Sequence, residues 1–109
     1  MSDQKVIDTN WLKSQYKGNM KDLLVIYKKE NDECMLRIQN ALNSQDHDDI
    51  RAIAHKMKGS SRIIGAFVVE GLADHIEKTF DPVELQSKVT QLQENYKDLI
   101  REIDSLIAN

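Results

Sequence analysis

Apolar residues recur at spacings of three and four along most of this chain, and this spacing limits its possible folds more than any other feature. A stripe of this kind occupies one side of an α-helix and needs a second apolar surface to cover it. The longest one consists of Leu85, Val89, Leu92, Tyr96, Leu99, Ile103 and Leu106. Only 4 Gly and 1 Pro occur in 109 residues, which leaves room for long helices and few connections. The pattern predicts an all-α fold.

Capping residues divide these stripes into five expected helices. Asp8, Asn19, Asp46 and Asp81 each carry an oxygen that can accept a bond from the first turn of a helix, and Pro82 suits a first helical position. The expected segments are a short helix over 9–17 and longer helices over 20–43, 47–64, 66–80 and 82–106. Their short connections predict an antiparallel up-down four-helix bundle, with the short N-terminal helix as a lid. A parallel dimeric coiled coil from the last helix is the alternative, which is less favoured because the other helices already offer apolar faces.

Length, charge and cysteine content limit the class of protein. The chain is long enough for one domain, 1–109, in which residues 1–7 are expected to be flexible. Its 15 basic residues are outnumbered by 18 acidic ones, so the charge gives no support for a nucleic-acid partner. The single Cys34 cannot form an internal disulfide and is in register with apolar neighbours, which predicts a packed core thiol. No apolar run approaches the roughly 20 residues that cross a membrane, and no signal peptide is recognised. We expect a cytoplasmic protein without membrane insertion.

The segment 50–66 contains the most reactive combination of residues. At about 100° per residue, one helical side collects Ile50, Ile53, Ala54, Met57, Ser61 and Ile64. His55 lies roughly 140° from the centre of that side. Arg51, Lys58, Gly59 and Arg62 surround it. A histidine held outward among cations, beside a position without a side chain, is poorly placed for a core role and well placed for chemistry.

This segment resembles the signature of histidine-containing phosphotransfer (HPt) domains. The matching residues are Ala54-His55-x-x-Lys58-Gly59-Ser60-Ser61-x-x-x-Gly65-Ala66, followed by Val69, Ala73, Ile76 and Glu77. Val69 stands where the family pattern favours Leu, and Ala73 where it favours Cys or another small residue; both keep an apolar packing role. The resemblance implies a helical bundle that carries a phosphoryl group on one histidine between the aspartates of response-regulator receiver domains.

The resemblance also assigns roles to individual residues. His55 would be the phospho-acceptor, because a carrier needs an imidazole nitrogen that an aspartyl phosphate can reach in line. Lys58, one turn on, would pair with the phosphoryl oxygens. Gly59 would let the receiver backbone approach, which would compensate for the cost of about 1 kcal/mol that a mid-helix Gly carries relative to Ala. Arg51 and Arg62 would steer an acidic partner face or serve as solubilising charges.

Other residues near His55 are expected to have structural roles. Ser61 should face inward and bond the backbone, and Gly65 should end the helix.

The chain lacks a Gly-rich phosphate loop, so we expect a phosphoryl carrier without ATP-dependent kinase activity of its own. It differs from the dimerisation helix of a sensor kinase, where an acidic residue follows the histidine, because Lys56 follows His55 here. The implied partners of this monomer are receiver domains and a hybrid sensor histidine kinase. No cofactor is expected, since Mg²⁺ would belong to the receiver.

Two alternatives to this interpretation remain open, a metal site and a non-catalytic adaptor. His47 and His75 lack the Lys-Gly context and are expected to be ordinary surface residues. A metal site formed by the three histidines is not favoured, because no pair has the i, i+4 spacing of a helical two-histidine site. The bundle could instead be a non-catalytic adaptor that presents a docking surface to a signalling partner. Dependence on His55 separates this adaptor from a carrier.

Overall fold

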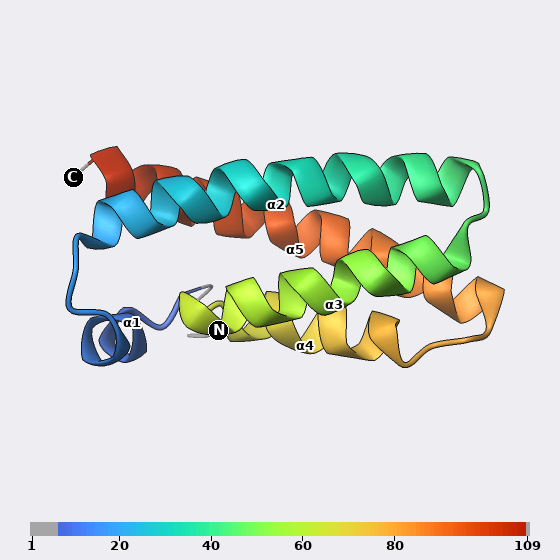
Figure 1. Cartoon of the computed structure of the whole chain (residues 1–109), viewed down its shortest axis with the longest axis horizontal. Helices are drawn as coiled ribbons and strands as arrows, with labels where there is room; N and C mark the ends of the chain where they lie inside the picture. Colours follow the sequence, from blue (N-terminus) through green and yellow to red (C-terminus); the bar gives the residue numbers. More distant parts are fainter. Residues whose placement is uncertain (1–6, 109) are drawn as a thin grey trace, which may run out of the picture.

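The computed structural model describes residues 7–108 and arranges them as a helical bundle. Its helices are α1 (Thr9–Gln15), α2 (Met20–Asn43), α3 (His47–Ile63), α4 (Phe67–Glu77) and α5 (Pro82–Ala108). Figure 1 shows that α2, α3, α4 and α5 run alternately up and down, whereas α1 lies at one end. The predicted all-α, up-down bundle with a short N-terminal helix is therefore confirmed. None of the helices in the described range is long and apolar enough to cross a membrane.

The helices begin at the capping residues expected from the sequence. Asp8 accepts from the Trp11 amide at 3.0 Å, and Asp46 from the Asp49 amide at 3.1 Å. Asn19 and Asp81 cap α2 and α5 in the same way. Each bond satisfies a first-turn N–H that has no partner within its own helix, so the beginnings of the helices are encoded locally.

The end of α4 differs from the prediction. The helix ends at Glu77, whereas the apolar pattern extends it to Phe80. The residue before a proline is disfavoured in the α conformation, so the chain must leave the helix before Pro82. The freed Thr79 carbonyl accepts a bond from Arg51 at 3.2 Å, and Phe80 is exposed. The other helix ends lie within two residues of their expected positions.

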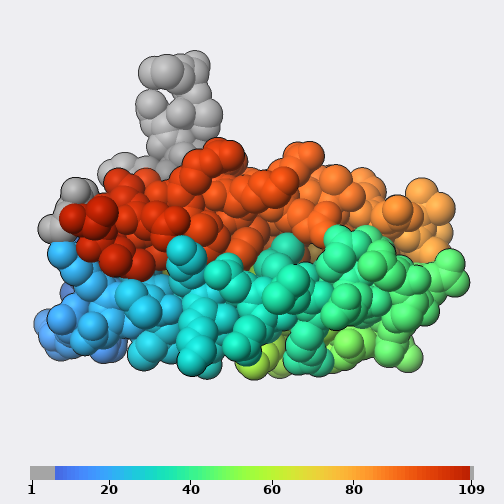
Figure 2. All heavy atoms as spheres, turned by 90° about the horizontal axis from the view of Figure 1, so that it is seen from above, coloured from blue at the N-terminus to red at the C-terminus, as the bar shows by residue number. Residues whose placement is uncertain are grey.

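The apolar stripes of the four long helices meet in one core. Every predicted inward residue of α3 is buried. Six members of the α5 stripe are also buried, namely Leu85, Val89, Leu92, Tyr96, Leu99 and Ile103. Figure 2 shows α2 and α5 side by side along one face, where Tyr96 donates to Asp32 at 2.7 Å. This packing fixes α3 and α4 on the other side of the bundle.

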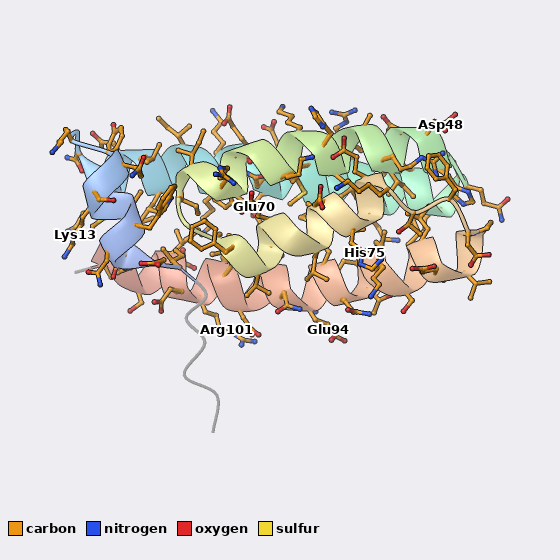
Figure 3. All side chains as sticks on the ribbon, turned by 90° about the horizontal axis from the view of Figure 1, so that it is seen from below. Lys13, Asp48, Glu70, His75, Glu94 and Arg101 are labelled. Carbon is orange, nitrogen blue, oxygen red and sulfur yellow. The ribbon has the colours of Figure 1, made fainter. Side chains whose placement is uncertain are left out.

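The short helix α1 closes one end of the core. Ile7 and Leu12 are fully buried, and the Asp8 amide donates to the Gly65 carbonyl at 3.0 Å. Figure 3 shows α1 lying across the ends of α3 and α4. The predicted flexible segment 1–7 falls outside the described residues except for Ile7, and that residue is held in the core because it packs beneath the lid.

Candidate functional site

His55 lies in the middle of α3, on the side that faces away from the core. Its neighbours Ala54 and Met57 are buried, whereas the His55 side chain is 68% exposed. The outward orientation predicted from the helical angle is confirmed. A reactive group at this position can be reached by another protein without any opening of the bundle.

Two polar contacts hold α3 in register against α2 beneath this histidine. The hydroxyls of Tyr27 and Ser61 are 2.7 Å apart in the core. Ser60 donates to the buried Asn31 side chain at 3.1 Å. Ser61 faces inward as predicted, but its bond goes to a hydroxyl on α2 rather than to the backbone. The backbone contacts are made instead by Ser60, whose hydroxyl lies near the carbonyls one turn earlier.

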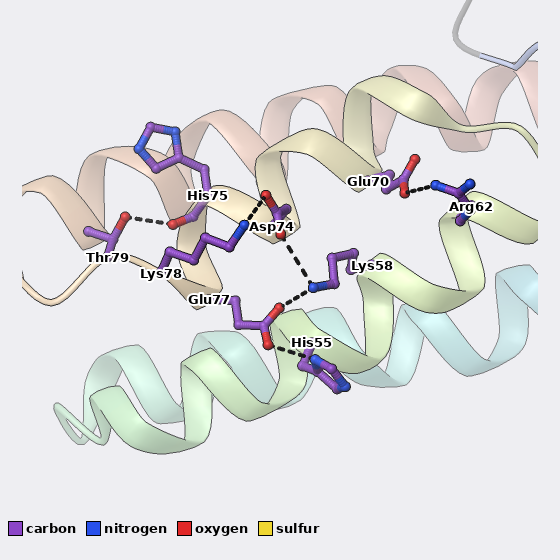
Figure 4. A network of polar contacts seen from close by, with 9 residues as sticks. All are labelled: His55, Lys58, Arg62, Glu70, Asp74, His75, Glu77, Lys78 and Thr79. Carbon is purple, nitrogen blue, oxygen red and sulfur yellow. Dashed lines mark hydrogen bonds and ion pairs between the residues drawn. The ribbon is translucent and has the colours of Figure 1, made fainter.

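A carboxylate from α4 joins His55 to Lys58. One oxygen of Glu77 lies 2.6 Å from Nδ1 of His55, and the other lies 2.6 Å from Nζ of Lys58 (Figure 4). Lys58 also reaches Asp74 at 3.3 Å, and Asp74 accepts from Lys78 at 3.0 Å. The five side chains form one continuous line of alternating partners along the seam between α3 and α4.

The charges in this line stabilise one another. The bond from Lys58, and secondarily the one from His55, lowers the pKa of Glu77 below its ordinary value. Lys78 and then Lys58 lower the pKa of Asp74. The bond to Glu77 in turn raises the pKa of Lys58. Glu77 and Asp74 are therefore carboxylates near neutral pH, and Lys58 is a cation.

The contact with Glu77 distinguishes the two ring nitrogens of His55. An ionised carboxylate can only accept a hydrogen bond, so Nδ1 must carry the proton in this contact. The lone pair of the neutral ring then resides on Nε2, for which no bond to another described residue is found. Because the side chain is mostly exposed, this nitrogen is available to an incoming electrophile.

The predicted cationic surround of His55 is only partly formed. The side chain of Arg51 is 15% exposed, pairs with Asp48, and lies over the Phe80 ring at 4.4 Å. It therefore serves the α4–α5 connection rather than His55. Arg62 remains 66% exposed and pairs loosely with Glu70 at 3.3 Å. Lys58 lies one turn from His55 as expected, although its ammonium is already bound by carboxylates.

The two glycines of the motif have different surroundings. Gly59 is exposed, and a Cβ built there would meet no atom within 4 Å. Gly65 has φ +74°, which lies in the left-handed region, and a Cβ there would come within 2.9 Å of the Asp8 carbonyl and of the Trp11 ring. Gly65 thus ends α3 and receives the lid, as its predicted structural role requires.

The carboxylates Glu77 and Asp74 are the site residues that sequence reasoning missed. Glu77 belongs to the matched motif, but the pattern alone gave it no role. The available signal was the spacing of three between two acids on one helix, opposite the lysine of an antiparallel neighbour. Using that signal requires knowing how far each helix is rotated about its axis.

The remaining candidate residues lie apart from this line. His47 begins α3, and His75 on α4 approaches Glu84 at 3.3 Å. Within residues 7–108 no group of three or more His, Cys, Asp or Glu side chains is arranged to hold a metal ion. Cys34 is buried as predicted, and burial raises the pKa of its thiol.

The structure is thus an up-down helical bundle that presents an outward histidine beside a carboxylate and a lysine. A family model for the Hpt domain matches residues 22–109, and the chain belongs to this family. Neither the comparison with curated proteins nor the comparison with solved structures gave a match. Family membership indicates a phosphotransfer role in two-component signalling, in which Hpt domains interact with receiver domains. Helix α1 precedes the matched range.

Proposed function

We propose that His55 accepts a phosphoryl group from the aspartate of one receiver domain and passes it to another in a multistep phosphorelay. The observation that carries this proposal is that the two nitrogens of the imidazole ring have different surroundings. Nδ1 is engaged by Glu77 at 2.6 Å, while the exposed side chain leaves Nε2 accessible. A nucleophile with a fixed tautomer and an open approach is what transfer between two proteins requires.

The transfer step follows from this geometry. The lone pair of Nε2 attacks the phosphorus of an aspartyl phosphate, and a P–N bond forms as the P–O bond to the aspartate breaks. The aspartate leaves with the electron pair as a carboxylate. Nδ1 of His55 keeps its proton, and the Glu77 carboxylate stabilises the positive charge that develops on the ring. Transfer to the second receiver is the reverse of this step. The Mg²⁺ ion would be held by the receiver.

Lys58 is the cation that would pair with the phosphoryl oxygens, since it shares the Glu77 carboxylate with His55. To reach them, its ammonium must exchange at least one carboxylate contact for a phosphoryl contact. Asp74 retains Lys78 as a partner at 3.0 Å when this happens, so Lys58 can turn away without leaving Asp74 unpaired. Gly59 and Arg62 lie on the same exposed side of α3 and would meet the receiver, whereas Arg51 is held by Asp48 and Phe80 and would only border this contact.

The proposed protein is a monomeric cytoplasmic carrier that depends on other proteins for its phosphoryl group. A hybrid sensor histidine kinase would supply the first receiver domain, and a response regulator the second. The carrier would use no cofactor and no ATP of its own.

Transfer of labelled phosphate from a phosphorylated receiver tests this function. Wild type and His55→Gln would be compared with His75→Gln, the matched control on α4. The expected result is acid-labile, base-stable label on wild type and His75→Gln, with none on His55→Gln. Label retained on His55→Gln would refute the assignment of the site. Binding of receivers that is insensitive to His55→Gln, with no label on any protein, would favour the adaptor instead.

A further inference from the structure

A groove between α3 and α4 begins at the site and extends away from His55. Its volume is about 470 Å³, and its walls include Lys58, Gly59 and Arg62 from α3 and Phe67, Gly71 and Asp74 from α4. Figure 4 shows the Lys58–Asp74 and Arg62–Glu70 contacts between these two helices. The groove shares Lys58 with the line of contacts to His55, so the two form one continuous surface.

Two glycines line this groove, one from each helix, and the fold requires neither of them. Gly59 and Gly71 lie within helices, and a Cβ at either position would meet nothing within 4 Å. A glycine inside a helix costs stability relative to alanine, because more backbone freedom is lost on folding. Neither close packing nor a left-handed backbone explains these glycines. Their shared effect is to leave the groove open to a bulky partner.

We infer that this groove receives a helix of the receiver domain, so that the receiver docks over both α3 and α4 and Gly71 belongs to the interface. The inference rests on the proposed function, since the receiver must cover His55 to reach Nε2. From there the open surface continues along the glycines towards Phe67 at the far end, a residue that is 40% exposed. Glu70 also lines the groove and pairs with Arg62 at 3.3 Å, but the Arg62 side chain remains 66% exposed. Its guanidinium and the Phe67 ring suit a helix that carries both an acidic and an apolar residue.

The residues of α4 that line the groove also connect it to the contacts of Lys58. Glu77, Asp74 and Gly71 succeed one another along one side of α4, so a helix seated on Gly71 also passes beside the carboxylates that hold Lys58. Docking and release of Lys58 thus take place on the same surface. A second copy of this chain is the competing occupant, and it would leave the transfer rate independent of the groove.

Gly71→Gln is the variant that tests this inference, since it places a flexible side chain in open space on a helix. Ser87→Gln is the matched control on the exposed side of α5, away from the groove. Transfer from a phosphorylated receiver would be compared with labelling by phosphoramidate, a small donor that needs no docking surface. Thermal unfolding and sedimentation would report folding and self-association, and Gly71→Ala would serve as a second variant with less added bulk.

The expected result is a rate from the receiver that falls about tenfold or more relative to the rate from phosphoramidate in Gly71→Gln, which corresponds to about 1.4 kcal/mol. Gly71→Ala should change in the same direction by less, and Ser87→Gln should keep the wild-type ratio. An unchanged ratio in Gly71→Gln would overturn the inference while leaving the carrier function intact. So would a loss of self-association at constant transfer rate. Absence of receiver-dependent label on wild type would overturn both.

Discussion

The buried hydrogen bond between Tyr27 and Ser61 should make a measurable contribution to the stability with which α3 is held against α2. The two hydroxyl oxygens are 2.7 Å apart, and both side chains are buried. Ser61→Ala removes one hydroxyl and leaves the Tyr27 hydroxyl in the core without this partner. A buried polar group that loses its partner costs about 1–3 kcal/mol. For a domain of this size, each kcal/mol lowers Tm by roughly 4–8 °C.

The two single substitutions should not be equivalent. After Tyr27→Phe, the Ser61 hydroxyl can turn to the Met57 carbonyl one turn earlier in α3, as serines in helices commonly do. The Tyr27 hydroxyl cannot do the same, because the rigid ring holds it away from the backbone of its own helix. We therefore expect Ser61→Ala to be the more destabilising change. The double variant removes both polar groups at nearly constant volume, so its cost should fall short of the sum of the single costs by about 0.5–1.5 kcal/mol.

Urea unfolding followed by far-UV circular dichroism measures these free energies for the wild type and the three variants. Ser87→Ala, which removes an exposed hydroxyl from α5, is the control and should stay within about 0.5 kcal/mol of wild type. Single costs that add to within about 0.3 kcal/mol would show that the two hydroxyls are energetically independent. That result would refute the reasoning, however short the distance between them.

Three further predictions concern the lid and the site. Gly65→Ala should lower the unfolding free energy by about 1–3 kcal/mol in the same assay, because it forces a left-handed alanine against Trp11; an unaltered midpoint would contradict this. Lys58 and His55 hold the pKa of Glu77 low. The ionised carboxylate therefore stabilises the fold at pH values above its ordinary pKa of 4.5, and this contribution is lost as the pH falls through the lower pKa of the folded state. Tm recorded against pH should therefore fall less steeply on acidification in Glu77→Gln than in wild type, and parallel curves would count against the contact. Asp74→Asn frees Lys58 from one carboxylate, so the equilibrium of phosphoryl exchange with a receiver should move towards phosphorylated His55; no movement would argue against competition for Lys58.

The fold was largely predictable because its determinants are local in sequence. The stripe from Leu85 to Leu106 fixes both the helical state of α5 and its buried side, and the side chain of Asp81 marks where the helix begins. The end of α4 was mispredicted because Phe80 continues the apolar spacing although it lies outside the core and remains 72% exposed. Periodicity indicates which residues can be buried, whereas a competing backbone restriction decides where the chain turns.

The candidate site was predictable only for the residues of one helix. The orientation of His55 follows from its angle on α3, which the sequence supplies directly. The roles of Glu77 and Asp74 depend on how α4 is rotated against α3, and the course of Arg51 depends on a free carbonyl in the α4–α5 connection. These relations join residues 16 to 28 positions apart. For the same reason, the choice between Nδ1 and Nε2 could not be made before the partner of the ring was known.

Because of the line of contacts between α3 and α4, phosphorylation of His55 would change the net charge of the docking surface of the proposed carrier. Lys58 and Lys78 balance Glu77 and Asp74, so this part of the unloaded surface has little net charge. A phosphoryl group adds roughly 1.5 to 2 negative charges at neutral pH. The loaded and unloaded forms therefore present different electrostatic potentials to a receiver that approaches the same surface. Association rates respond to such potentials, so a receiver can distinguish a full carrier from an empty one before the two proteins touch.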